Sequence, residues 1–359
     1  MDFAVHPFVF ATGTSKGLLG MLETMWVRGT PVGQGTIYIV SGFANYNGGV
    51  RFYRFFEDHI HAGGKVVTIF GGSTSQRLSS REVVDELLSR GVEVRIVNRK
   101  RLFHAKLYGV ESSAGNYLVV TSGNFTGPGM SQNVEASVLI EPIQTSQMGF
   151  SWHKLMSSIQ TQSWQQYIMP PTLASTHPVW RLLYQETAVG PLPPLEESQK
   201  VTLVVILGHH DTARINAPPG TTASLGSQYF WLSRDSYDFF PPLTIKNRRG
   251  IKATFSCDID LSFIDIGVRR TCRVTFEAEN NLDFRLGTGP LRNTGVAQSG
   301  DMAALTRINE SEYQLRIIRA TSLEFAAIEP YAVTFIGHRR KRYGYIPNDE
   351  FAAIMGITL

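Results

Sequence analysis

Residues 101–108 read R-L-F-H-A-K-L-Y, a pattern that predicts a β-strand with one apolar face. Because residues i and i+2 of a strand point to the same face, His104 and Lys106 are expected to project together. Phe103, Ala105 and Leu107 are expected to face the core. Two adjacent cations lower each other's tendency to be charged unless an anion lies between them, and a phosphate is such an anion. This stretch therefore predicts a strand that presents a phosphate site.

The flanking segments alternate between strand and helix patterns, which indicates an α/β domain. The strand-like runs are residues 36–42, 65–70, 92–98, 102–110, 117–122 and 133–141. The helical patterns cover residues 48–60, 79–90 and 148–164. The helix over 79–90 has Ser79 or Ser80 as its N-cap, Glu82 in its first turn and Gly91 after its end. We expect residues 1–168 to form one α/β domain with a mixed sheet flanked by helices.

A second domain is expected after a proline-rich linker. Residues 165–200 contain six of the 17 prolines, and the periodicity fails there. We place the linker at 169–199 and the second domain at 200–359. That domain consists of short alternating runs with frequent turn signals, which is typical of an antiparallel barrel or sandwich. The expected strands are residues 201–207, 228–233, 243–246, 252–257, 272–279, 302–308, 313–319 and 332–337.

The composition excludes several classes of protein. The 359 residues carry a formal net charge of only +4, so the chain is not a histone-like polycation. The two cysteines, Cys257 and Cys272, cannot form a disulfide-stapled scaffold or a cysteine-rich zinc site. The sequence has neither an N-terminal signal pattern nor an apolar stretch of about 20 residues, so we expect a cytoplasmic location without membrane contact.

A glycine-rich turn and a carboxylate follow the strand of His104. Residues 122–129 read S-G-N-F-T-G-P-G, which would present Asn124 as an amide donor, and Glu135 lies in the next strand-like run. A carboxylate there could hold one imidazole nitrogen and set the tautomer. A lone H-x-K pair is common and mostly structural, but the four-residue order is harder to explain in that way. The expected catalytic residues are His104, Lys106, Asn124 and Glu135.

This order of motifs resembles the single-copy signature of the phospholipase D superfamily. The superfamily usually has H-x-K-x-x-x-x-D, whereas the last position here is Glu111, so we assign the carboxylate role to Glu135. The resemblance implies phosphodiester cleavage without a metal or other cofactor, through a phosphohistidine and a second histidine that acts as general acid. With one H-x-K motif, it implies a homodimer in which both copies of His104 act, while Lys106 and Asn124 neutralise the phosphate.

Basic residues favour DNA or RNA as the substrate over a lipid. Residues 95–106 contain five basic residues and no acidic one, directly beside the expected site. The second domain has three further clusters of side chains that grip phosphates or read base edges. The candidate DNA-binding residues are Arg214, Asn216, Lys246, Asn247, Arg248, Arg249, His338, Arg339, Arg340, Lys341 and Arg342.

Longer runs resemble the BfiI-type metal-independent restriction endonucleases across nearly the whole chain. They include S-G-F-A-N-Y-N-G-G-V-R-F-Y, F-G-G-S-T-S-Q-R-L-S-S-R, H-A-K-L-Y-G, S-G-N-F-T-G-P-G-M-S-Q-N-V-E, Y-F-W-L-S-R-D-S-Y-D-F-F-P-P-L-T-I-K-N-R-R-G and F-E-A-E-N-N. The resemblance implies a phospholipase-D-like nuclease domain joined to an all-β pseudobarrel similar to plant B-three domains. Residues around 214–216 and 337–342 would be two arms in the major groove. It also implies type II, IIS-like cleavage of double-stranded DNA and a cognate DNA methyltransferase in the same system.

Other interpretations fit less well. A Mg²⁺-dependent restriction nuclease would need a carboxylate two residues before a lysine, and none of the nine lysines has one. The F-G-G-S-T-S loop lacks the G-K-[ST] of a P-loop. His209 and His210 would point opposite ways on an extended segment, which disfavours a metal site with Asp211. Two alternatives stay open, namely a sequence-specific DNA-binding protein without catalysis and a phospholipase-D-type phosphodiesterase with another substrate.

Overall fold

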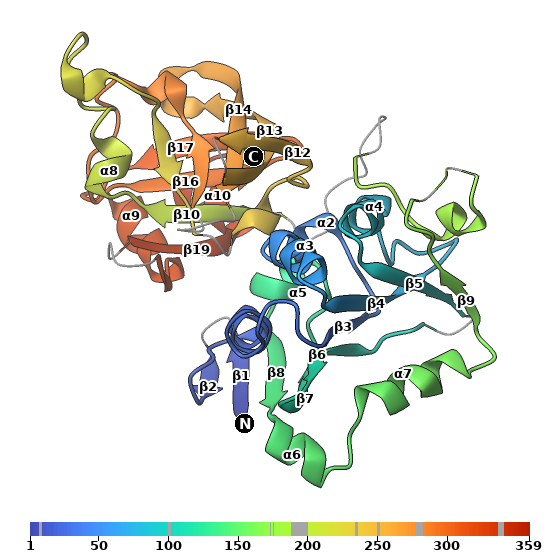
Figure 1. Cartoon of the computed structure of the whole chain (residues 1–359). Coiled ribbons are helices and arrows are strands. Elements are labelled where there is room, and N and C mark those ends of the chain that lie inside the picture. The colour runs from blue at the N-terminus through green and yellow to red at the C-terminus, as the bar shows by residue number, and fades with distance from the viewer. Residues whose placement is uncertain are drawn as a thin grey trace. The chain divides into compact units, whose positions relative to one another are not determined.

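The chain folds into two compact units, Met1–Thr187 and Ala188–Leu359, which Figure 1 shows for a computed structural model. The structure describes residues 1–6, 9–99, 102–172, 174, 176–187, 200–233, 236–249, 252–277, 283–336 and 341–359. Within these ranges, no helix combines the length and the apolar character that crossing a membrane requires.

The first unit is built on a mixed nine-stranded sheet in the order β2-β1-β8-β7-β6-β3-β4-β5-β9. The strands are β1 (Asp2–His6), β2 (Phe10–Thr12), β3 (Thr36–Ser41), β4 (Lys65–Gly72), β5 (Glu93–Asn98), β6 (Lys106–Ser112), β7 (Gly115–Thr121), β8 (Glu135–Ile140) and β9 (Gln165–Ile168). Strands β3, β4 and β5 run parallel, and β6 is antiparallel to β3. The predicted α/β domain with a mixed sheet is confirmed.

Helices cover both faces of this sheet (Figure 1). They are α1 (Leu18–Leu22), the π-helix η1 (Glu23–Arg28), α2 (Tyr46–Gly49), α3 (Tyr53–His61), α4 (Arg81–Ser89), α5 (Gly127–Ser131), α6 (Pro142–Gln147), α7 (Trp152–Gln160) and the 3₁₀ helix η2 (Pro178–Leu182). Trp152 of α7 stacks on Tyr38 of β3 in one core layer. Trp26 packs against Phe56 of α3 on the opposite layer.

Helix α4 shows why some boundaries could be read from the sequence. Ser80 is its N-cap and accepts a hydrogen bond from the Val83 amide at 3.2 Å, and Glu82 lies in its first turn. Gly91 follows the helix with φ +82°, a conformation that favours glycine. The helix runs from Arg81 to Ser89, which confirms the prediction. It could be predicted because each of these interactions involves residues close together in the sequence.

The strand predicted over 102–110 begins four residues later than expected. Strand β6 starts at Lys106, and residues 102–105 are irregular. A Cβ at Gly42 would lie 2.5 Å from the carbonyl oxygen of Phe103, so the glycine allows this segment to pass close to the end of β3. His104 and Lys106 therefore do not share a strand, although Phe103 is buried in the core as predicted.

Residues that were assigned to the linker pack on the first unit. Val179 and Leu182 are buried, and the Tyr184 amide donates to the Ser79 carbonyl. The Tyr46 amide donates to the Glu186 carboxylate at 2.7 Å, and burial raises the pKa of Glu186 to about 7. The first unit thus extends to Thr187, whereas the sequence suggested an end at residue 168. Residues 188–199 lie outside the described residues.

The second unit is a curled, half-barrel sheet in the order β11-β15-β14-β13-β17-β16-β10-β19-β18, with β12 paired to β13. The strands are β10 (Val201–Ile206), β11 (Tyr229–Trp231), β12 (Ile245–Arg249), β13 (Lys252–Phe263), β14 (Val268–Glu277), β15 (Phe284–Gly287), β16 (Met302–Arg307), β17 (Glu312–Ile318), β18 (Thr334–Ile336) and β19 (Lys341–Pro347). Strands β13 and β17 are parallel, and the other pairings are antiparallel. The prediction of a strand-rich second half is confirmed.

Short helices close this unit. They are α8 (His209–Thr212), η4 (Thr222–Ser224), η5 (Tyr237–Phe239), η6 (Ile264–Ile266), η7 (Gly289–Leu291), α9 (Leu323–Ile328), η8 (Glu329–Tyr331) and α10 (Asn348–Met355). Phe351 of α10 and Ile328 of α9 share a core with Val204 of β10. Cys257 and Cys272 are free and buried within the sheet.

Strand β13 is longer than the predicted run over 252–257. It continues to Phe263 because Asp258 and Asp260 lie on its outer face, alternating with buried apolar residues. Asp258 lies directly opposite Arg273 of β14 and forms an ion pair with it at 2.9 Å. Asp258, the first residue after the predicted run, is thus stabilised by a partner on the neighbouring strand.

Candidate functional site

The ends of several strands meet at one edge of the first sheet. Strand β3 ends at Ser41, which pairs with Lys106, the first residue of the antiparallel strand β6. Strand β7 ends at Thr121, and β8 starts at Glu135 on the same edge. The loop between β7 and β8 carries Asn124. The topology therefore brings the candidate residues to one edge, although up to 31 positions separate them in the sequence.

His104 is exposed at this edge, in the irregular segment before β6. The ring of Phe43 contacts its imidazole edge-on, with ring centroids 5.8 Å apart. Partial burial lowers the pKa of His104, and the charge of Lys106 lowers it further. The lowered pKa favours the neutral imidazole, whose nitrogen lone pair can attack an electrophile.

Lys106 is buried next to His104, with 8% of its surface exposed. Its ammonium group donates a hydrogen bond to the His104 carbonyl oxygen at 3.0 Å. Burial lowers the pKa of Lys106, whereas the nearby Glu135 carboxylate raises it. A cation held at this place can compensate the negative charge of a phosphate bound at His104.

Asn124 is held by the backbone at the end of β3. Its side-chain oxygen accepts a hydrogen bond from the Phe43 amide at 3.3 Å. Ser41 braces the same loop, because its hydroxyl accepts from the Phe125 amide at 2.9 Å and donates to the Phe43 carbonyl at 2.6 Å. With the oxygen engaged, the NH₂ group of the Asn124 amide is the donor left for a phosphate oxygen.

Glu135 is 9% exposed and is stabilised by two side chains. The Ser122 hydroxyl donates to one carboxylate oxygen, and the Asn133 amide donates to the other at 3.2 Å. Among the described residues of this chain, no hydrogen bond joins Glu135 to His104. The predicted role of Glu135 in orienting the imidazole therefore stays a prediction, whereas its charge does raise the pKa of Lys106, against the effect of burial.

A second histidine lies at this edge and was not singled out from the sequence. His6 of β1 pairs in register with Glu135 of β8, and its ring hydrogen-bonds the Ser137 hydroxyl at 3.2 Å. Burial lowers the pKa of His6, with the Glu135 charge opposing the shift. Because His6 is 3% exposed, it serves packing rather than contact with a large substrate.

Glu111 lies away from the catalytic candidates. It stands five residues beyond Lys106 on β6, which places it roughly 17 Å along the strand toward the opposite edge. Its carboxylate accepts a hydrogen bond from the Tyr38 hydroxyl at 3.1 Å. Burial, helped by this carboxylate, raises the pKa of Tyr38 to about 12. This position supports the choice of Glu135 over Glu111.

An arginine-lined groove of about 910 Å³ lies on the second unit. Arg270 of β14 and Arg292 line it, and Gly226 on its wall lies beside the guanidinium of Arg214. Arg214 donates a hydrogen bond to the Leu225 carbonyl at 2.7 Å, which fixes its side chain. Sequence reasoning found Arg214 but missed Arg270 and Arg292, because only the fold brings β14 and the segment of Arg292 together at this groove.

The remaining DNA-binding candidates of the second unit differ in what the structure describes. Asn216, Lys246 and Asn247 are exposed, whereas nothing is described for the side chains of Arg248 and Arg249. Residues 337–340, with His338, Arg339 and Arg340, lie outside the described residues.

The prediction for Lys341 is wrong, because this lysine is 4% exposed and does not reach the surface. Its ammonium group pairs with the Asp211 carboxylate at 2.8 Å and donates to the Trp231 carbonyl at 2.6 Å. Its neighbour Arg342 is half-exposed and forms an ion pair with Glu329. The basic run that resembled a DNA-binding arm therefore includes a residue that stabilises the domain instead.

His209 and His210 do not lie on an extended segment as expected. They begin the short helix α8, where both are exposed and their ring centroids are 5.8 Å apart. Asp211 is buried and bound to Lys341, so it is not available to a metal ion beside these histidines. A search of the described residues finds no group of three or more metal-ligating side chains.

Comparisons with known proteins bear on both units. Residues 195–358 match the family model described as the DNA-binding domain of the metal-independent restriction enzyme BfiI. Residues 40–148 match the model described as cardiolipin synthase, PLD-like domain. No curated protein sequence matches the chain.

Two solved structures show weaker similarity. The phospholipase D family member Nuc from Salmonella typhimurium is 16% identical, and the match covers 37% of this chain and 82% of Nuc with a TM-score of 0.29. Polyphosphate kinase from Porphyromonas gingivalis is 12% identical, and the match covers 44% of this chain and 23% of the kinase with a TM-score of 0.26. At these scores the alignments alone do not establish a common fold.

The two family models together support a restriction-type nuclease. One covers the strands that carry Lys106 and Glu135, and the other covers nearly all of the second unit. The chain thus combines a segment that matches a PLD-like domain with a segment that matches the DNA-binding domain of the metal-independent restriction enzyme BfiI, in agreement with the resemblance to BfiI-type enzymes found in the sequence.

Proposed function

We propose that the protein is a type II, IIS-like restriction endonuclease that cleaves double-stranded DNA at specific sites without a metal ion. The proposal depends on one observation above all. His104, Lys106, Asn124 and Glu135 gather at one sheet edge, in a chain whose second unit matches a restriction-enzyme DNA-binding domain. Neither a lipid phosphodiesterase nor a non-catalytic binder accounts for both features.

In the proposed reaction, a neutral His104 nitrogen attacks the scissile phosphorus. The phosphorus–nitrogen bond forms as the bond to the leaving oxygen breaks, and a second histidine, which enters the step in its protonated form, gives that oxygen a proton and becomes neutral. Water then attacks the phosphohistidine, loses its proton to the second histidine and releases His104. Lys106 and the Asn124 amide stabilise the extra negative charge at phosphorus in both steps.

The second histidine is proposed to be His104 of a second copy of the chain. His104 is exposed and could meet its counterpart across a two-fold axis, whereas His6 is buried. Glu135 is proposed to keep Lys106 charged, as its effect on the pKa of Lys106 supports, and to orient an imidazole of the shared site.

The second unit is proposed to recognise the DNA sequence. We propose that its curled sheet is a pseudobarrel similar to plant B-three domains, and that residues 200–359 form the recognition domain. The exposed basic residues and the arginine-lined groove support this assignment. A cognate DNA methyltransferase is expected in the same system, because a restriction enzyme endangers the DNA of its own cell.

Cleavage of a supercoiled plasmid in excess EDTA tests the proposed function. We expect the wild-type protein to give discrete fragments, because His104 supplies the nucleophile that a metal-bound water supplies elsewhere. Cutting that requires added Mg²⁺ would refute the metal-free mechanism. Selective binding without any cutting would favour the non-catalytic binder, and hydrolysis of phosphatidylcholine vesicles instead of DNA would favour the lipid phosphodiesterase.

Arg270→Ala is expected to weaken selective DNA binding roughly 10- to 100-fold, because one arginine contact with a base or phosphate contributes about 1–3 kcal/mol. Arg214→Ala should act in the same direction. The matched control is Arg269→Ala, because Arg269 is the preceding residue of β14 and pairs with Asp260 and Glu312 outside the groove. Fluorescence anisotropy with a cognate duplex measures the effect. Equal losses in Arg269→Ala and Arg270→Ala would show that only the net charge matters.

A further inference from the structure

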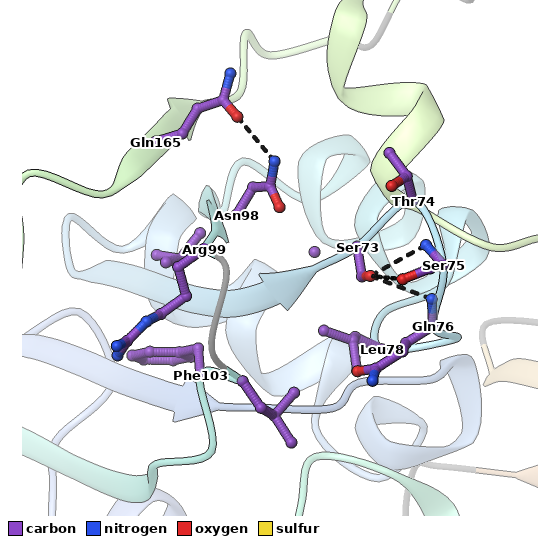
Figure 2. Close-up of a pocket in the computed structure, with 12 residues that line it drawn as sticks. Ser73, Thr74, Ser75, Gln76, Leu78, Asn98, Arg99, Phe103 and Gln165 are labelled. Atoms are coloured by element: carbon purple, nitrogen blue, oxygen red, sulfur yellow. Dashed lines mark hydrogen bonds between the residues drawn. The ribbon is translucent and has the colours of Figure 1, made fainter.

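A polar cavity of about 430 Å³ lies at the carboxyl ends of β4 and β5, on the same sheet edge as the catalytic candidates. Figure 2 shows Ser73, Thr74 and Gln76 on one side of it and Asn98 with Arg99 on the other. Phe103 also lines the cavity, and the next residue is His104. The cavity therefore adjoins the segment that carries the proposed nucleophile.

The charge of the cavity favours an anion. Arg99 is a cation, and none of its lining residues is acidic. The Arg99 guanidinium lies 4.4 Å from the ring centroid of Trp164, so stacking holds it in place. No hydrogen bond or ion pair of Arg99 occurs in the described part of the chain, which leaves its N–H donors to a ligand.

The other polar groups form a fixed rim around this cation. The Ser73 hydroxyl accepts hydrogen bonds from the Ser75 and Gln76 amides, each at 3.1 Å, and this holds the turn after β4. The Asn98 amide donates to the Gln165 side chain at 2.8 Å, which ties the end of β5 to the start of β9. A rim that is already ordered loses little conformational freedom when a ligand binds.

The basic residues of 95–106, beside the catalytic motif, have different partners. Arg95 is half-buried and held by Glu93 at 2.6 Å, so it does not face a substrate. Lys106 belongs to the catalytic candidates, and residues 100–101 lie outside the described residues. Arg99 is thus the described member of the run that remains for a second phosphate.

We propose that this cavity binds a backbone phosphate of the DNA strand being cut, a few nucleotides from the scissile phosphate. The inference rests on the proposed nuclease function. Strands β4 and β5 lie two and three strands away from β6, or roughly 10–15 Å at 4.8 Å per strand. Because a DNA strand winds around its axis as it rises 3.4 Å per nucleotide, this direct span corresponds to about two nucleotides along the strand. Arg99 then sets the register of the strand at His104.

The test combines Arg99→Met with single methylphosphonate substitutions, which remove the charge of one DNA phosphate at a time. Once sequencing of plasmid fragments has located the cut, duplexes carry one such group at each position around it. In the wild type, one position within about four nucleotides of the cut should slow cleavage roughly 10-fold. Arg99→Met should be slower on unmodified DNA and insensitive to that position, because the contact is already lost.

Arg28→Met is the matched control. Arg28 is exposed at the end of η1 and does not line the cavity, and its loss changes the net charge equally. It should keep the wild-type interference pattern. Thermal unfolding of Arg99→Met checks that the packing on Trp164 survives. A full wild-type pattern in Arg99→Met would overturn the inference.

Two further arms separate the possible failures. If the wild type does not cleave DNA, the proposed function fails, and anisotropy with the same duplexes still tests whether one position depends on Arg99. Inorganic phosphate is then compared with chloride at equal ionic strength. Phosphate could inhibit DNA cleavage or DNA binding in the wild type but not in Arg99→Met, while no methylphosphonate position has an effect. That result would assign the cavity to a free anion and overturn the DNA assignment.

Discussion

His104→Ala is expected to lose plasmid cleavage in EDTA by a factor of at least about 10⁴, because it removes the atom that forms the covalent intermediate. Lys106 would then have no neighbouring imidazole to act with, and its charge alone cannot cleave a phosphodiester. Since His104 lies in the first unit and the groove arginines lie in the second, binding to a cognate duplex should change less than about 3-fold. Single-turnover cleavage and anisotropy measure the two quantities separately.

His153→Ala is the control for the loss of a histidine, because His153 is exposed on α7 and away from the catalytic edge. It should cleave like the wild type. Mixed dimers of wild-type and His104→Ala subunits, purified through two different tags, extend the test. A single shared site predicts far less than half of the wild-type rate, whereas independent sites predict half. Wild-type cleavage by His104→Ala would exclude it as the nucleophile.

Lys341→Met is expected to destabilise the second unit by about 3–5 kcal/mol, since it leaves a buried carboxylate without its counter-ion. The Asp211 carboxylate also accepts hydrogen bonds from the Gly208 amide at 2.7 Å and the Trp231 amide at 2.9 Å. Lys341 thus neutralises the buried Asp211 carboxylate, which links β10, α8 and β11 just before Arg214. Urea denaturation measures the free energy of unfolding, and hydrogen exchange by mass spectrometry locates the loss.

The control for this variant is Arg269→Met, which removes one positive charge from an exposed ion pair. Its effect should stay below about 1 kcal/mol. If Lys341 instead contacted DNA at the surface, Lys341→Met would leave the unfolding free energy unchanged and reduce only DNA binding. That result would restore the role that the basic run around residue 341 first suggested.

Local interactions explain which elements could be predicted. The helix α4 was found from its caps, because Ser80 and Gly91 act within a few residues of the helix ends. Strand β13 extends beyond the predicted run over 252–257, and the arginine partner of Asp258 in this extension lies on another strand, which the local sequence does not reveal. Strand β19 was missed because its basic residues suggested a surface arm.

The sequence by itself determined the α/β character of the first half, the strand-rich second half and the identity of the motif residues. These features depend on residue periodicity and on the order of motifs, both of which are properties of the chain alone. Tertiary structure decided what each basic residue does: it buried Lys341, paired Arg95, and left Arg99 and Arg270 facing a cavity and a groove. A charge is neutralised or left available by partners that are distant in sequence, so its role depends on the fold that brings those partners together.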